Sequence, residues 1–286
     1  MKSYKTFRCL NFGKRSLILV LFILTSCKKN IYNTVCDYDF NIGNGLSINP
    51  LSKQIFISKP TGKKDKKDKN QYSLYELSFS KKNYYSTELI TVNSKYSDYH
   101  PVFSVKGDFL LFNSTRPKPN DSTSNGKVDI YMSQYKDGKL SKPKYLEKIN
   151  TEYHDSYPTL TKINKLYFNS DRPGGKGMMD IYVSEYKNGN WQTPNLVPEL
   201  NSEHSENDLV VDPDERFIIL NRYITDSKEI DLFISYNENG KWSEPKPMDS
   251  INKPNVWELT PTLSLDGKTL FLEVNGKVEC YEIEYN

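Results

Sequence analysis

The sequence predicts an all-β protein built as a ring of five four-stranded antiparallel sheets, a five-bladed β-propeller, with six blades as the alternative count. The first observation is a strict repeat: the pentapeptide that begins at Asp129 recurs at Asp180 and Asp231, each step being 51 residues. Turn signals also divide each repeat into four short apolar runs, and no stretch after Cys27 has helical periodicity. A fixed period of this kind indicates an array of similar units, and radially repeated four-stranded sheets form a propeller.

The first 26 residues are expected to be a secretory signal peptide that is not part of the fold. They carry five basic residues and no acidic one, followed by the apolar run Leu17–Leu24, which is too short to span a membrane. The segment ends in Leu24-Thr25-Ser26-Cys27, which resembles the bacterial lipobox. This resemblance implies cleavage before Cys27 and lipidation of Cys27, with an ordinary signal peptide as the alternative. No aspartate follows Cys27, and in the sorting pattern this resembles, that favours the outer membrane over the inner one.

The charge of the mature chain argues against a nucleic-acid partner. The whole chain has a formal net charge of +3, but the signal peptide removes five positive charges and leaves the mature part at −2. A nucleic-acid-binding domain would need a basic face. The expected contact with a membrane is therefore made through the lipid anchor and not through a basic surface.

The 51-residue units give the expected blades, at about residues 44–92, 93–149, 150–200, 201–252 and 253–286. The third is clearest: strands at 157–161, 165–170 and 180–186 precede the Asn188-Gly189 hairpin dipeptide, and 191–197 closes the sheet. The first unit is degenerate, with strands expected at 46–49, 54–58 and 73–79. The last has strands at 259–264, 269–274 and 277–285 and lacks its fourth strand.

We expect the segment 27–43 to hold a lipidated linker and a strand, within 31–40, that completes the last blade and closes the ring. Without it the last blade would expose a bare strand edge. Cys36 and Cys280 lie in the two terminal segments. In an oxidising compartment they are candidates for a disulfide that locks the ring, and two buried thiols are the alternative.

A family resemblance appears in the third unit. The run from Ser170 to Tyr182, Ser-Asp-Arg-Pro-Gly-Gly followed by Asp-Ile-Tyr, resembles the signature of the WD40-like, TolB-type propeller repeat. Ser264-Leu265-Asp266-Gly267-Lys268 is similar to the Ser-Pro-Asp-Gly-Lys turn of that repeat. The resemblance implies a propeller in the cell envelope and does not imply a reaction.

An acid stands three residues before the start of four inner strands, and these acids should circle one end of the central channel. They are Asp98, Asp155, Glu206 and Glu258. The rim could bind a cation or a basic partner. Folding each hairpin places an arginine beside three of the acids, so structural ion pairs are the alternative. These arginines are Arg116, Arg172 and Arg222. Glu258 has none and is the better candidate for a free functional acid.

The remaining motifs favour a binding protein over an enzyme. No Gly-x-Ser-x-Gly elbow is present, the three histidines occupy different offsets in their units, and no metal-ligand spacing is visible. No catalytic residue, metal or cofactor is therefore predicted. We expect a lipid-anchored, outer-membrane module that binds a protein or glycan. The alternative is a glycan-active enzyme, a sialidase-like hydrolase or a lyase, that uses the arginine and acid rim.

Overall fold

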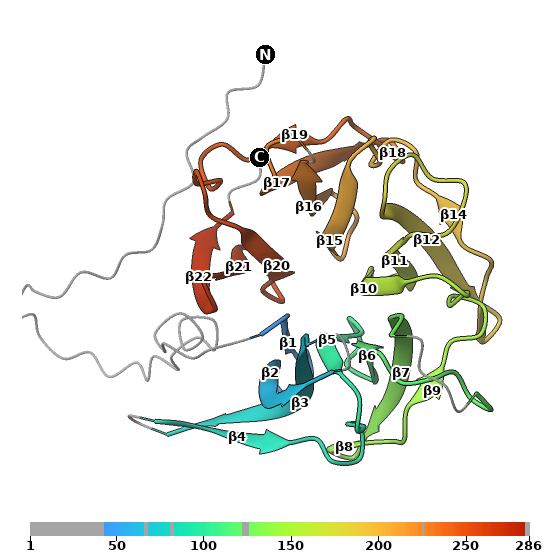
Figure 1. Cartoon of the computed structure of the whole chain (residues 1–286), viewed down its shortest axis with the longest axis vertical. Coiled ribbons are helices and arrows are strands. Elements are labelled where there is room, and N and C mark those ends of the chain that lie inside the picture. The colour runs from blue at the N-terminus through green and yellow to red at the C-terminus, as the bar shows by residue number, and fades with distance from the viewer. Residues whose placement is uncertain (1–42, 66–67, 81–82, 122–125, 225, 284–286) are drawn as a thin grey trace, which may run out of the picture.

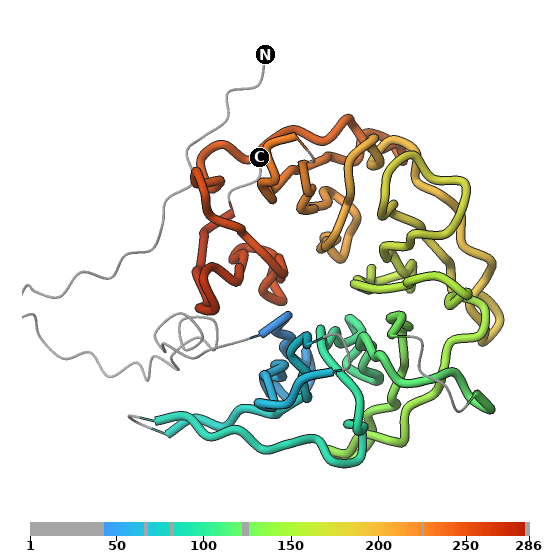
Figure 2. Tube along the Cα trace, in the orientation of Figure 1, coloured from blue at the N-terminus to red at the C-terminus, as the bar shows by residue number. Residues whose placement is uncertain are grey.

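The computed structural model describes residues 43–65, 68–80, 83–121, 126–224 and 226–283. Within these ranges the chain forms five antiparallel sheets arranged in a ring (Figures 1 and 2). The predicted five-bladed β-propeller is confirmed. The described ranges contain no helix that could cross a bilayer.

Each blade begins with an inner strand next to the centre of the ring and proceeds outward along the chain (Figure 1). The first blade has β1 (Leu46–Ile48), β2 (Ile55–Lys64), β3 (Asn70–Phe79) and β4 (Tyr84–Glu88). The second has β5 (Asp98–Phe103), β6 (Phe109–Ser114), β7 (Asp129–Lys136), β8 (Lys139–Leu140) and β9 (Lys144–Tyr145). The third has β10 (Asp155–Leu160), β11 (Lys165–Ser170), β12 (Asp180–Lys187), β13 (Asn190–Trp191) and β14 (Asn195–Leu196). The fourth has β15 (Ser205–Val211), β16 (Phe217–Ile224), β17 (Glu229–Glu238), β18 (Lys241–Trp242) and β19 (Lys246–Pro247). The fifth has β20 (Glu258–Leu263), β21 (Thr269–Val274) and β22 (Lys277–Glu282).

The second strand of each blade is apolar on both sides because a neighbouring blade packs on each face. In β6, the consecutive residues Leu110, Leu111 and Phe112 are all fully buried. Strands that are covered on both faces lose the alternation of apolar and polar residues. The core is accordingly divided into five clusters, one between each pair of adjacent blades.

The ring closes through one of these clusters. Ile57 and Leu77 of the first blade pack with Phe271 and Cys280 of the last. Burial of apolar surface at this seam stabilises the closed ring in the same way as at the other four junctions.

In blades two to four the outer strand differs from the expected single strand. It is broken into two short pieces, and both pieces pair with the third strand. In the third blade, β13 and β14 replace the continuous strand expected over 191–197. At the break, the hydroxyl of Ser184 donates a hydrogen bond to the carbonyl of Gln192 at 2.6 Å. Pro194 follows and has no N–H to continue the ladder. Ser133 and Ser235 make the equivalent bond in blades two and four, each at 2.6 Å.

The asparagine that recurs at each 51-residue step hydrogen-bonds to the third strand through its side chain, as the backbone of a neighbouring strand would. We call this interaction the asparagine rung. The Asn201 side chain accepts from the N–H of Ile181 at 2.6 Å and donates to its carbonyl at 3.0 Å. Asn150 and Asn252 hold Ile130 and Leu232 in the same way. Buried backbone groups need partners, and here a side chain supplies them where the outer strand has left the sheet.

The fifth blade has three strands within the described residues, and β22 forms the edge of that sheet. The predicted signal peptide, Cys27, Cys36 and the ring-closing strand within 31–40 lie outside the described residues. Cys280 on β22 is disulfide-bonded, and its partner cysteine also lies outside them. The pairing of Cys36 with Cys280 therefore stays a prediction.

Candidate functional site: the central channel

Three inner strands carry a bulge at the same place, where a non-glycine residue with positive φ precedes a proline. The dipeptides are His100-Pro101 (φ 54°), Tyr157-Pro158 (54°) and Thr260-Pro261 (48°). The pairing register with the second strand shifts at each of them. A bulge redirects a side chain, and positive φ in a non-glycine residue persists only where the surroundings hold it. The inner strands are thus shaped to turn selected side chains toward the centre.

These side chains meet at the centre of the ring in what we call the channel cluster. The rings of His100 and Tyr157 contact edge to face at 5.0 Å between centroids. The Nε2 of His100 lies 3.9 Å from Oδ1 of Asp208, which comes from the fourth blade. Tyr99 approaches Tyr157 at 6.5 Å. The cluster comprises Tyr99, His100, Tyr157, Asp208, Thr260 and Glu273.

Burial shifts the pKa values of the channel cluster toward the uncharged forms of its members. It lowers the pKa of His100 to about 3 and raises the pKa of Asp208 well above its ordinary value. Burial likewise raises the pKa values of Tyr99, Tyr157 and Glu273. Removing a group from water disfavours its charged form, and at 3.9 Å the histidine and aspartate are too far apart for a hydrogen bond. Burial thus favours the uncharged forms of His100 and Asp208, and no hydrogen bond joins the two side chains.

Four buried polar atoms at this level have no hydrogen-bond partner among the described residues. They are His100 Nδ1, Asn169 Oδ1, Asn221 Oδ1 and Thr260 Oγ1, whereas the amide of Asn113 hydrogen-bonds to Tyr99. Asn113, Asn169 and Asn221 occupy equivalent positions on the second strands. The other polar atom of each amide forms a hydrogen bond with the backbone of the inner strand in the next blade. Buried polar groups are normally satisfied, so the cluster offers both donors and acceptors to ordered water or to a polar group of a ligand.

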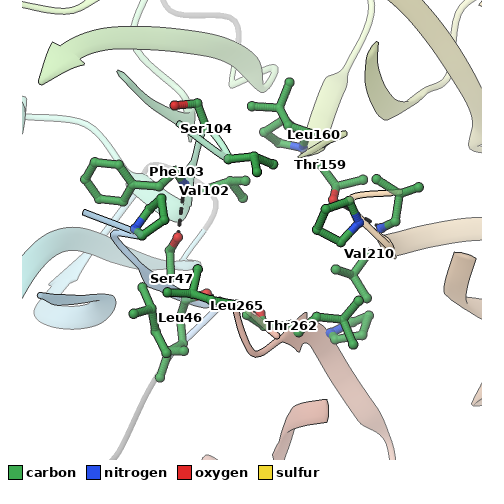
Figure 3. Close-up of a pocket in the computed structure, with 18 of the residues that line it drawn as sticks. Leu46, Ser47, Val102, Phe103, Ser104, Thr159, Leu160, Val210, Thr262 and Leu265 are labelled. Carbon is green, nitrogen blue, oxygen red and sulfur yellow. Dashed lines mark hydrogen bonds between the residues drawn. The ribbon is translucent and has the colours of Figure 1, made fainter. Parts of the chain in front are cut away.

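Above the polar cluster, the channel opens into an apolar vestibule of about 170 Å³ (Figure 3). All five blades line it, and His100 lies at its base. Val102, Val210 and Leu265 are partly exposed, so the vestibule is open to solvent. The labelled lining residues with apolar side chains include Leu46, Val102, Leu160, Val210 and Leu265. This end of the channel could accept an apolar side chain or a small apolar group.

The predicted acidic rim lies at the opposite ends of the inner strands and is closed by ion pairs. Arg116 Nη2 lies 2.6 Å from Asp98 Oδ1, and Arg222 Nε lies 2.8 Å from Glu206 Oε1. Arg172 binds Asp155 in the same way. All of the acids are fully buried. The acids therefore offer no free carboxylate to solvent. This is the arrangement that structural ion pairs, the alternative to a binding rim, would produce.

Each arginine also fastens neighbouring parts of its blade. The Arg172 guanidinium donates to the Ser170 hydroxyl at 2.9 Å and to the Ile149 carbonyl at 2.7 Å. It also stacks 4.8 Å from the ring centroid of Tyr182. Arg116 makes the corresponding contacts in the second blade. These are the contacts of a structural latch between the chain entering the blade and its second and third strands.

Glu258 differs from the other acids because no arginine of the described residues forms an ion pair with it. It is fully buried, and its polar interactions are with the backbone N–H groups of Lys253 and of Glu258 itself and with the charge of Lys253, all of which lower its pKa. Burial raises its pKa to about 7. Its role in binding stays a prediction.

Sequence reasoning missed the channel cluster although a signal was present. The three histidines lie at different offsets within the repeat, so they do not point to a common site. The residues at the position of His100 in other blades are of other types, such as Tyr157 and Thr260. The informative pattern has four positions: an acid, any residue, the variable residue and a proline. It is seen in Asp98-Tyr99-His100-Pro101 and in Asp155-Ser156-Tyr157-Pro158. The variable residue is the one that enters the channel. No group of three or more His, Cys, Asp or Glu residues in the described part of the chain could hold a metal ion.

Comparison with known proteins identifies the fold and no family. The chain superposes on a protein described as TolB from Agrobacterium tumefaciens with a TM-score of 0.51 and 14% identity, covering 82% of this chain and 70% of the other. A Hadza microbial sialidase gives 0.50 and 9%, covering 83% and 51%. The periplasmic gluconolactonase of Pseudomonas aeruginosa gives 0.49 and 14%, covering 84% and 68%. No protein-family model and no curated protein matches the sequence.

Proposed function

We propose that this chain is a lipid-anchored propeller of the bacterial envelope that acts as a non-enzymatic binding module for a protein or glycan partner. The apolar vestibule favours a protein that inserts an apolar side chain at the channel mouth. The observation that carries the proposal is this vestibule, which all five blades build and which is open to solvent. The resemblance of the run ending at Cys27 to a lipobox supports an outer-membrane location.

The binding energy would come from apolar surface. Aliphatic side chains such as Val210 and Leu265 are partly exposed at the mouth, and burial of apolar area contributes about 25 cal/mol per Å². The channel cluster below them adds hydrogen-bond partners for a polar group at the end of the inserted side chain. A small, well-shaped pocket of this kind suits one anchoring side chain at the centre of an interface.

The alternative of a glycan-active enzyme has less support. Such an enzyme would need a pair of unpaired carboxyl groups roughly 5–10 Å apart, or arginines free to hold a carboxylate. Arg116, Arg172 and Arg222 are instead paired with buried acids of their own blades. The likeness to a sialidase is a likeness of fold alone.

A site-specific photo-crosslinker tests the proposal in the lipidated full-length chain in native envelopes. A crosslinker in place of Leu265, at the channel mouth, is expected to give a discrete protein adduct. The control replaces Tyr85, an exposed residue of the outer strand β4, and should not give that adduct. Adding Val210→Asp should abolish the adduct, because a charge then stands in the apolar mouth. Identical patterns from both crosslinker positions, or an adduct that survives Val210→Asp, would contradict the proposal.

The proposed anchor has a separate test. Radiolabelled palmitate should label the wild-type chain and not Cys27→Ala, and the variant should leave the membrane fraction. Release of sugar from a fluorogenic sialoside by the purified chain would instead favour the enzymatic alternative.

A further inference from the structure

A second cavity, of about 230 Å³, lies on the last blade at the other end of β20 from the vestibule. Its lining consists of Asn255, Trp257, Leu259, Glu273, Asn275 and Gly276. Trp257 is 51% exposed, whereas Trp191 and Trp242 are each 7% exposed. Pockets for drug-sized ligands usually measure roughly 300–1,000 Å³. This cavity therefore suits a single small unit, such as one ring of a larger molecule.

The lining residues face the same way because of strand geometry. Side chains alternate along a strand, so Trp257 and Leu259 lie on one face while Glu258 between them is buried on the other. Leu259 is paired in register with Glu273 on β21, and Asn275, in the turn after β21, also lines the cavity. The β20–β21 hairpin thus presents an indole ring beside carboxyl and amide groups.

The connection that follows the second strand is shorter in this blade than in the other four, and the cavity is open on that side. In blades two and three, 14 and 9 residues separate the second strand from the third, at 115–128 and 171–179. In the last blade only Asn275 and Gly276 intervene, and both have positive φ, 52° and 77°. Two-residue hairpin turns use such residues. Among the described residues, the turn between the second and third strands of this blade is therefore too short to cover Trp257.

The cavity also lies at the seam of the ring. The Asn44 N–H of the first blade donates to Oε2 of Glu273 at 2.9 Å. Gly43 and Gly45 flank Asn44, so the first blade brings backbone and not bulky side chains to this point.

We propose that this seam cavity binds a neutral sugar ring of a glycan, with Trp257 stacking on the ring and the amides of Asn255 and Asn275 bonding to its hydroxyls. Tryptophan offers a flat apolar face together with a polar N–H, a combination suited to ligands that are apolar on one side and polar on their edges. Amide side chains both donate and accept hydrogen bonds, as hydroxyl groups do. The described residues that line the cavity include no lysine or arginine, so an acidic sugar would lack a charge partner among them. Burial raises the pKa of Glu273, which keeps this carboxyl closer to neutral.

Because Trp257 is the exposed one of the three tryptophans, its fluorescence reports on the cavity. The mature protein is titrated with glucose, galactose, mannose and N-acetylglucosamine, with short oligosaccharides of each, and with N-acetylneuraminic acid as the acidic comparator. At least one neutral sugar should give a saturable change in emission and protect the protein from acrylamide quenching. Absence of a saturable change with every neutral sugar, or preference for the acidic one, overturns the proposal.

Variants then assign the binding to the cavity, with affinity measured by calorimetry so that the readout survives loss of the tryptophan. Trp257→Ala should weaken binding about tenfold or more, and Trp257→Phe should retain part of the affinity. Tyr85→Ala, a truncation of an aromatic side chain that is 61% exposed on β4, is the matched control and should bind as the wild type does. Unchanged binding by Trp257→Ala overturns the proposal. The crosslink from Leu265 should persist in Trp257→Ala, so failure here leaves the channel proposal standing.

Discussion

Arg172 is held by more contacts than an exposed arginine could maintain. Its guanidinium pairs with a fully buried aspartate, bonds to a carbonyl and a hydroxyl, and stacks on two aromatic rings. Breaking a buried pair from one side leaves an uncompensated charge. The two partners therefore contribute more to the stability of the folded state as a unit than either does alone.

The first prediction follows from this arrangement. Arg172→Ala should lower the free energy of unfolding by about 3–5 kcal/mol because Asp155 is left buried and unpaired. Lys162→Ala is the matched control, since it removes a lysine from an ion pair whose two side chains are about half exposed. It should cost about 1 kcal/mol or less. Chemical denaturation of the mature domain measures both, and equal losses would contradict the latch.

Glu258 provides a prediction about pH. Its pKa is raised from 4.5 to about 7 in the folded protein, so between these values the folded state holds a proton that the unfolded state releases. The free energy of unfolding should therefore fall as pH rises from about 4.5 to 7. Glu258→Gln removes this dependence and should be more stable than the wild type at pH 8, by about 3 kcal/mol because each pKa unit corresponds to about 1.4 kcal/mol, with little difference at pH 4.

The control for this prediction is Glu206→Gln, which alters the equivalent acid in a blade that has an arginine. Glu206 binds Arg222 at 2.8 Å, so this variant should be less stable than the wild type at pH 8. Denaturation at pH 4 and pH 8 compares the two. A loss of stability in both variants at pH 8 would mean that Glu258 is paired after all.

Individual residues could be predicted from the sequence only where the repeat aligned them. The arginine and acid pairs follow from folding a hairpin about its turn, which fixes cross-strand neighbours. The channel cluster does not follow, since His100, Tyr157, Asp208 and Thr260 share a position and no chemistry. Their meeting depends on bulges, and a bulge is a local departure from the alternation on which strand prediction relies.

At the scale of the element, strand existence was predictable and the shape of the outer strand was not. The hairpin dipeptides and the 51-residue step locate each strand. The break between β13 and β14 depends on the Ser184 hydroxyl reaching the carbonyl of Gln192, a contact that no local pattern announces. Proline and serine recur with the repeat, and this recurrence can be seen in the sequence. That they break the outer strand together cannot be seen there, because the break depends on a contact with the third strand in the folded blade.

The asparagine rung gives the third prediction. Asn201→Ala removes two hydrogen bonds to the backbone of Ile181 inside the sheet. The Ile181 carbonyl still accepts from the Val197 N–H at 3.0 Å, but the buried Ile181 N–H is left unpaired. The variant should therefore lose about 1–3 kcal/mol of unfolding free energy. Asn190→Ala, at an exposed position of the same blade, should change it by about 0.5 kcal/mol or less. Amide hydrogen exchange should also quicken at Ile181 in the first variant. A protected Ile181 amide in Asn201→Ala would count against the rung.

For the whole molecule, stability depends on how the two ends of the chain are joined. The seam already packs Ile57 and Leu77 against Phe271, but β22 is left as an edge among the described strands. Exposed edges invite pairing with other chains. Cys280 on this edge is disulfide-bonded, so a second constraint acts where packing alone would leave the last blade free to open.

The last prediction concerns the partner of Cys280. In the mature lipoprotein that we propose, Cys9 has left with the signal peptide and the thiol of Cys27 carries lipid, which leaves Cys36 as the available partner. Peptide mapping by mass spectrometry without reduction should recover a Cys36–Cys280 crosslinked peptide, and the denatured, unreduced protein should have no free thiol. Cys36→Ser with Cys280→Ser should lower the unfolding free energy by about 2–4 kcal/mol, since a crosslink restricts the unfolded chain. The same loss should follow reduction of the wild type, and reduction should not affect the variant. Recovery of a Cys27–Cys280 peptide would refute both this pairing and the lipidation of Cys27, because one sulfur cannot carry both.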